Sequence, residues 1–87
     1  MPESQDILVY GAGGHGRVVL DAALRMPGLR VVGVVDDDPK GHGERILGVD
    51  VLGGAAILSE PRFGACRVVV AIGDAAARAE AVARVEA

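Results

Sequence analysis

Short apolar runs alternate with polar and glycine-rich segments along the chain. The first run, Ile7–Tyr10 (ILVY), is unbroken and ends at a cluster of glycines, a pattern typical of a parallel strand buried on both faces. Between Arg17 and Met26 the period changes, because apolar residues recur at i, i+3, i+4 and i+7 and predict an amphipathic helix that ends before Pro27-Gly28. The apolar positions of this helix are Val19, Ala22, Ala23 and Met26, with Leu20 and Leu24 in a neighbouring row.

A second β-rich run, Arg30–Val35 (RVVGVV), is closed by the acidic segment Asp36–Pro39. Its branched residues favour a strand, and the residue before a proline is disfavoured in a helix. A strand, a helix and a second strand within about 30 residues predict a βαβ unit, in which the two strands lie parallel in one sheet.

The middle of the chain predicts less regular structure. Glycine, charged residues and His42 predominate from Lys40 to Gly48, and we expect a mobile surface loop there. Val49–Leu52 predicts a short edge strand, and Ala55–Leu58 predicts a brief helix after two glycines.

The last part of the chain returns to a strand followed by a helix. Arg67–Ile72 (RVVVAI) predicts a third strong strand. An alanine-rich helix is expected from Ala75 to the end, with Asp74 as its N-cap. The alternation of strands and helices predicts an α/β fold with a small, mostly parallel sheet, as one domain over residues 1–87.

Composition narrows the class of protein. Hydrophobic residues make up 51% of the 87 residues and aromatic residues only 2%, so the core must pack through small and branched aliphatic side chains. The net charge of −3 argues against a nucleic-acid partner, which would require a basic face.

The single cysteine, Cys66, excludes an internal disulfide, and a reducing, cytoplasmic location is expected. The apolar runs are too short to span a bilayer, so no membrane association is expected.

The most informative segment is the glycine-rich loop after the first predicted strand. Gly11, Gly13 and Gly16 satisfy the pattern G-x-G-x-x-G between a predicted strand and a predicted helix. Asp36 lies 20 positions beyond Gly16, at the end of the second predicted strand. This combination indicates a nucleotide with a diphosphate, although a tight turn without a ligand stays an alternative.

Each residue of the motif has an expected role. Gly11 allows the tight turn, Gly13 lets the backbone approach a diphosphate, and Gly16 lets the helix pack closely on the strand. The N-terminus of the helix offers backbone N–H groups and a partial positive charge to the phosphates. Asp36 and Asp37 are expected to accept hydrogen bonds from ribose hydroxyls or base N–H groups, and three consecutive aspartates disfavour the extra phosphate of NADP.

Other polar residues are less specific. His15, Arg17, Gly73 and Asp74 are open between a role in the site and a structural role. His42 is interpreted as an ordinary loop residue and Cys66 as a small buried residue. The sequence contains no recognisable catalytic constellation and no predicted metal site.

The motifs, taken in order, resemble a known family. The segments LVYGAGGHGRVVLDAA, VVGVVDDDP, GVDVLGG and VVVAIGDAAAR are similar to the N-terminal domain of the NeuD/PglD-like sugar O- and N-acyltransferases. The likeness covers essentially the whole chain. Family members often have asparagine after the A-I-G-D turn, where this chain has Ala75.

The resemblance implies a Rossmann-like domain that binds the uridine diphosphate part of a nucleotide-activated amino sugar. In the family, a left-handed β-helix follows this domain, forms a homotrimer, binds acetyl-CoA and supplies a catalytic histidine. None of that second domain is expected within these 87 residues, so the fragment is expected to bind substrate and to be inactive alone, with no cofactor of its own. The nucleotide-binding residues that the resemblance implies are Gly11, Gly13, Gly14, His15, Gly16, Arg17, Asp36, Asp37, Ile72, Gly73 and Asp74.

Two other functions stay open on the sequence alone. The same glycines and Asp36 would suit an NAD-binding half-domain of a dehydrogenase or epimerase. A regulatory module that senses CoA or another ligand is the third possibility. The particular sugar and the choice between N- and O-acylation are not encoded in any motif of this chain.

Overall fold

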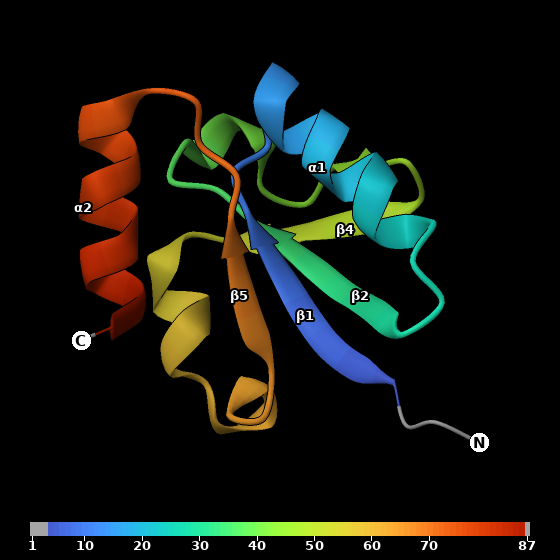
Figure 1. The fold of residues 1–87 in the computed structure, drawn as a ribbon. Coiled ribbons are helices and arrows are strands. Elements are labelled where there is room, and N and C mark those ends of the chain that lie inside the picture. Colours follow the sequence, from blue (N-terminus) through green and yellow to red (C-terminus); the bar gives the residue numbers. More distant parts are fainter. Residues whose placement is uncertain (1–3, 87) are drawn as a thin grey trace.

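The computed structural model describes residues 4–86, which form one sheet with helices on both faces (Figure 1). Five strands lie in the order β3-β4-β2-β1-β5. Four of them are parallel, and β3 is antiparallel to β4. The strands are β1 (Gln5–Tyr10), β2 (Leu29–Val35), β3 (Arg45–Ile46), β4 (Val49–Gly53) and β5 (Arg67–Val70).

Two helices and three short 3₁₀ turns complete the fold. Helix α1 (Gly14–Leu24) connects β1 to β2, and α2 (Ala75–Glu86) follows β5. The predicted βαβ unit and the helix after the last strand are therefore confirmed. The predicted brief helix is the 3₁₀ turn η2 (Ala55–Ser59), which lies between η1 (Pro39–Gly41) and η3 (Pro61–Phe63) in the chain.

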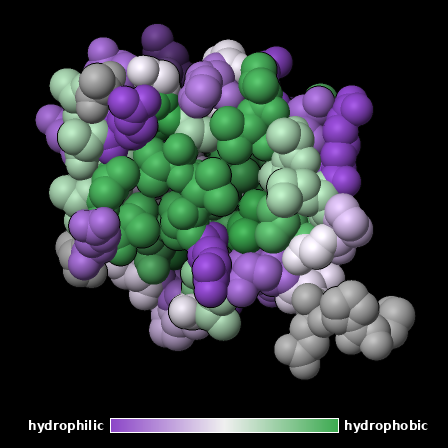
Figure 2. All heavy atoms as spheres, in the orientation of Figure 1, coloured by the Kyte–Doolittle hydropathy of each residue, from purple (hydrophilic) through white to green (hydrophobic). Residues whose placement is uncertain are grey.

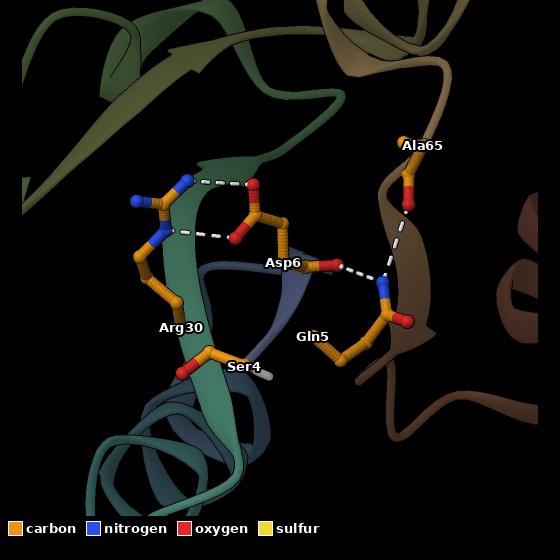
Figure 3. Close-up of a pocket in the computed structure, with 5 residues that line it drawn as sticks. All are labelled: Ser4, Gln5, Asp6, Arg30 and Ala65. Carbon is orange, nitrogen blue, oxygen red and sulfur yellow. Dashed lines mark hydrogen bonds and ion pairs between the residues drawn. The ribbon is translucent and has the colours of Figure 1, made fainter. Parts of the chain in front are cut away.

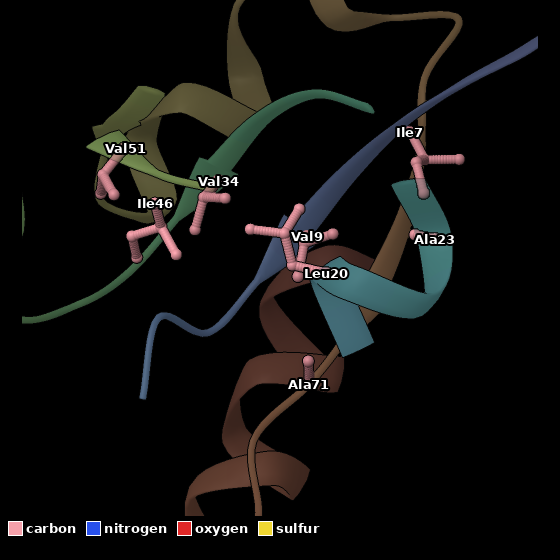
Figure 4. Packing of buried hydrophobic residues seen from close by; sticks show 8 residues of the cluster. All are labelled: Ile7, Val9, Leu20, Ala23, Val34, Ile46, Val51 and Ala71. Carbon is pink, nitrogen blue, oxygen red and sulfur yellow. The ribbon is translucent and has the colours of Figure 1, made fainter. Parts of the chain in front are cut away.

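The apolar runs are buried because both faces of the central strands are covered. Successive residues of β1 alternate between two clusters, with Ile7 and Val9 on the α1 face and Leu8 and Tyr10 on the other. The cluster under α1 is shown in Figure 4. It consists of Ile7, Val9, Leu20, Ala23, Val34, Ile46, Val51 and Ala71.

The opposite face is covered by α2, η2 and η3. Ala81 of α2 is completely buried there, and Val85 packs against the same cluster. Apolar side chains also gather across the middle of the face seen in Figure 2. Some apolar side chains of the molecule are exposed to solvent. Leu24 of α1 is 44% exposed, and Val69 of β5 is 37% exposed.

Two sequence predictions about the sheet are wrong. The segment expected to be a mobile loop contains β3, and Val49–Leu52 is not an edge strand, because β4 pairs with β2 on one side and β3 on the other. A two-residue turn joins β3 to β4, in which Leu47 and Gly48 both have positive φ, 52° and 82°. Leucine rarely adopts this conformation, so the turn has no recognisable sequence signal.

The buried row of α1 also differs from the predicted one. Gly16, Leu20 and Ala23 are buried, whereas Ala22 is exposed and Met26 lies beyond the end of the helix with 53% exposure. The close approach of Gly16 to the first strand determines which row faces the sheet. Strand β5 ends at Val70, two residues before the predicted end.

Candidate functional site

A cleft of about 540 Å³ lies at the carboxyl ends of the parallel strands. The chain turns in opposite directions on either side of β1, because β2 follows on one side and β5 lies on the other. Ligands of open α/β sheets bind at such a switch point. The cleft is lined by Gly11, Ala12, Gly13, Gly14, His15, Gly16, Asp36, Asp37, Asp38, Ala71, Ile72 and Gly73.

Two glycines of the motif are required by the fold itself. Gly11 has φ +130°, and a Cβ on it would lie 2.5 Å from the Ala71 carbonyl oxygen. A Cβ on Gly16 would lie 2.1 Å from the Gly11 carbonyl oxygen. Side chains at these positions would push α1 and the β5 end away from the first strand, which confirms the predicted structural roles of both residues.

Gly13 and Gly14 are different, because the fold does not need glycine at either position. A Cβ on either residue would meet nothing within 4 Å, and neither residue has positive φ. Gly13 is the N-cap of α1, and its carbonyl accepts the Arg17 N–H at 2.9 Å. The first turn of α1 contains no acidic residue. Its N–H groups and its partial positive charge therefore face the cleft without a carboxylate from the same turn to neutralise them.

The acidic rim of the cleft is formed by the residues that follow β2. The Asp36 N–H donates to the Gly53 carbonyl at 2.9 Å, and His42 Nε2 donates to the Asp36 carbonyl at 2.7 Å. His42 therefore holds the backbone of the rim, a role that its isolated position in the sequence did not indicate. The side chain of Asp38 accepts the Lys40 N–H at 3.0 Å and caps η1.

Asp37 is held by two residues from distant elements. Its Oδ1 accepts the Tyr10 hydroxyl at 2.7 Å, and its Oδ2 lies 2.7 Å from Arg84 Nη1. Burial, followed by the hydrogen bond to Asp37, raises the pKa of the Tyr10 phenol. The hydrogen bond to Tyr10 and the charge of Asp37 raise the pKa of Arg84. Neither Tyr10 nor Arg84 was predicted from the sequence, because nothing in a linear pattern relates residues 74 positions apart.

The cleft brings most of the expected site residues together. Ile72 and Gly73 line its far side, and a Cβ on Gly73 would lie 3.7 Å from His15 Cβ, so the two loops face each other at the mouth. Arg17 and Asp74 are exposed and do not line the cleft. The lining residues that the sequence did not predict are Ala12, Asp38 and Ala71.

A second hollow, of about 560 Å³, lies at the opposite, amino end of the strands (Figure 3). Arg30 Nε and Nη2 each donate to the Asp6 carboxylate at 2.7 Å, and the pKa of Asp6 is lowered mainly by this hydrogen bonding. Gln5 Nε2 donates to the Asp6 and Ala65 carbonyls. The two charged groups of this hollow, Asp6 and Arg30, are paired with each other, so the cleft at the carboxyl ends is the better candidate site.

Other kinds of site have no support in residues 4–86. In this part of the chain, no group of three or more His, Cys, Asp or Glu residues is placed to hold a metal ion. None of the described helices has the length and apolar character that crossing a membrane requires. Cys66 is half-buried against the α2 face, and burial raises the pKa of its thiol.

Comparison with solved structures places the fold among known proteins. The acetyltransferase domain of PglB from Neisseria gonorrhoeae FA1090, in complex with acetyl coenzyme A, matches with a TM-score of 0.68 and 29% identity over 95% of this chain. A second solved structure of the same domain matches with the same TM-score and identity. RSP, a Rex-family repressor, matches with a TM-score of 0.72 at 18% identity, which shows a shared fold only.

The chain spans 39% of the length of the Neisseria structure in its complex and 42% of the Rex-family structure. No curated protein matches the sequence at a significant level. The model of the family described as "PglD N-terminal domain" matches residues 6–85. This match covers nearly the whole chain, and the chain is a Rossmann-like α/β domain that belongs to the PglD N-terminal domain family.

Proposed function

We propose that this domain binds the nucleoside diphosphate part of a UDP-activated amino sugar. The observation that carries the proposal is the open backbone at Gly13 and Gly14. The fold does not require glycine at these positions, whereas a diphosphate that approaches the N-terminus of α1 would require it. Asp36 borders the same cleft and would accept a hydrogen bond from ribose or base. Ile72 and Gly73 would border the ligand on the far side.

The proposed role of the domain is to position the sugar for acetyl transfer by another part of a longer protein. Acetyl-CoA, which the Neisseria neighbour holds in its complex, is the proposed acyl donor of that protein. An amine or hydroxyl of the sugar would attack the thioester carbonyl there, forming an amide or ester as the C–S bond breaks, and the proton it loses would leave with CoA as the free thiol. Sugar-binding contacts would then be shared with the other domain, so we expect the isolated domain to bind its ligand weakly.

The first prediction concerns binding. Addition of millimolar UDP or a UDP-amino sugar should shift the backbone NMR signals of residues 13–17 and of Asp36. NAD and CoA are titrated in parallel, since a response to NAD alone would favour a half-domain of a dehydrogenase or epimerase. A response to CoA alone would favour a ligand-sensing module. Unchanged signals in the loop with UDP and the UDP-sugar would overturn the proposal.

A pair of glycine variants distinguishes ligand binding from folding. Gly13→Val places a side chain in the space assigned to the diphosphate and should weaken UDP binding by at least about tenfold. Its free energy of unfolding should change by no more than about 1 kcal/mol, because the added Cβ meets nothing. Gly28→Val is the matched control, since Gly28 is equally unobstructed but lies in the turn between α1 and β2. Retained binding by folded Gly13→Val would show that the loop does not hold the diphosphate.

A further inference from the structure

Three residues from distant parts of the chain form a hydrogen-bonded group beneath the acidic rim. We call Tyr10, Asp37 and Arg84 the latch. Asp37 accepts the Tyr10 hydroxyl at 2.7 Å and lies 2.7 Å from Arg84 Nη1, which also donates to the Tyr10 oxygen at 3.1 Å. The latch therefore connects the end of β1, the loop after β2 and the last turn of α2.

The three consecutive aspartates at the rim have three different environments. Asp38 caps η1 through its side chain. Both carboxylate oxygens of Asp37 are hydrogen-bonded within the latch, one to Tyr10 and the other to Arg84. Across residues 4–86, the Asp36 side chain has no hydrogen-bond or ion-pair partner, and Asp36 lines the cleft. Asp36 is thus the one carboxylate of the three with its full capacity to accept hydrogen bonds from a ligand.

Arg84 also changes the charge of the rim. Three adjacent carboxylates repel one another. The guanidinium of Arg84 offsets one of these charges from beneath the rim. Among residues 4–86, Glu80 is the second acidic residue paired with Arg84, with its carboxylate 3.8 Å from Arg84 Nη2 on the same helix.

We propose that Asp37 and Arg84 are positioning residues, which hold the loop after β2 so that Asp36 alone presents its carboxylate to the ribose or base. The proposal rests on the proposed function for the identity of the ligand, whereas the latch exists without a ligand. It differs from the expectation drawn from the sequence, in which Asp36 and Asp37 contact the nucleotide together. It also assigns a role in binding to Arg84, which lines no part of the cleft.

A double-mutant cycle tests the assignment. Arg84→Met and Asp37→Asn each break the latch and should each weaken UDP binding by roughly threefold to fivefold, because the ion pair is half-exposed and its strength is modest. The double variant should bind no more weakly than the weaker single variant, since both changes remove the same interaction. Asp36→Asn should have a larger effect than either.

The cycle has clear contrary outcomes. If Asp37→Asn weakens binding several-fold further in the Arg84→Met background, Asp37 contacts the ligand directly and the assignment is wrong. If Arg84→Met leaves UDP binding unchanged, Arg84 has no positioning role. Arg30→Met is the control, because it breaks an Arg–Asp pair of the same 2.7 Å length at the opposite end of the sheet and should leave binding unaltered.

A ligand-free measurement separates this proposal from the proposed function. Tyr10 is the one tyrosine of the chain, so its phenol can be titrated by near-ultraviolet absorbance without interference from another tyrosine. Arg84→Met should raise the Tyr10 pKa further, and Asp37→Asn should lower it. Both variants should also shift the Asp36 amide signal. If the wild-type domain binds no UDP-sugar, the proposed function fails and these ligand-free readouts alone decide whether the latch exists; unchanged values would refute it.

Discussion

Tyr10 is the last residue of β1, with its ring in the core and its hydroxyl hydrogen-bonded to Asp37 of the acidic rim. Its residue exposure is 0%, and its hydroxyl donates to Asp37 while it accepts from Arg84. A buried hydroxyl with both kinds of partner is stable as a neutral phenol, whereas a phenolate at this place would face the Asp37 carboxylate. The protonation of the Tyr10 phenol is therefore coupled to the stability of the fold.

This coupling predicts a loss of stability at high pH. The Tyr10 pKa is raised in the folded protein above its ordinary value of about 10, so the stabilisation is fully present below that value. It is lost as the pH rises through the folded-state pKa, because unfolding then releases the proton. Urea unfolding between neutral pH and pH values above the ordinary pKa measures the effect. Tyr10→Phe should abolish this part of the pH dependence, and an identical alkaline profile in the variant would contradict the prediction.

At the scale of elements, the β3–β4 hairpin has the least favourable local sequence. Leu47 has a φ of 52° and is 57% exposed, so neither backbone preference nor burial favours leucine there. The hairpin is held by the pairing of β3 with β4 and by Ile46, which packs in the core and is only 8% exposed. Tertiary packing therefore imposes a turn that the local sequence disfavours.

Leu47→Asn should stabilise the protein. Asparagine followed by Gly48 is a preferred pair for a two-residue turn with positive φ at both positions, and we expect a gain of about 1 kcal/mol in the free energy of unfolding. Chemical denaturation measures it. The control is Leu24→Asn, which makes the same change at an exposed site on α1 and should not stabilise. A loss of stability in Leu47→Asn would show that the leucine makes contacts that outweigh its backbone strain.

At the scale of the whole molecule, one sheet supports two clusters of modest size. Most strand residues contribute to one of them, and α1 covers its cluster with the buried residues Gly16, Leu20 and Ala23. A domain of this length has little surplus stability, of the order of 5–15 kcal/mol in all. Loss of one well-packed side chain therefore affects the whole domain.

Leu20→Ala should lower the free energy of unfolding by about 2–5 kcal/mol, because Leu20 is 1% exposed between α1 and β1. Val18→Ala on the same helix is the control, since Val18 is 68% exposed and should change stability by about 0.5 kcal/mol or less. Thermal or urea unfolding followed by circular dichroism distinguishes the two. Equal effects would mean that α1 does not pack on the sheet through the Leu20 row.

Local patterns were sufficient for three strands and for the glycine-rich loop. Hydrophobic runs predicted β1, β2 and β5, and the glycine spacing predicted the loop between β1 and α1, because a buried parallel strand and a tight turn each need particular residues over a few positions. The same spacing grouped Gly11, Gly13 and Gly16 with Asp36, and the cleft contains all four. The N-cap predicted at Asp74 stays a prediction.

The sequence by itself determined the βαβ unit, the last strand with the helix after it, the family resemblance and the glycines of the cleft, since these depend on neighbours in the chain. Only the tertiary structure decided that β3 and β5 form the two edges of the sheet, which row of α1 faces the sheet, and that Gly13 is open while Gly16 is not. It alone joined Asp37 to Tyr10 and Arg84. Hydrogen bonds between side chains 27 and 47 positions apart depend on how the sheet and α2 pack in space, and no local periodicity records that packing.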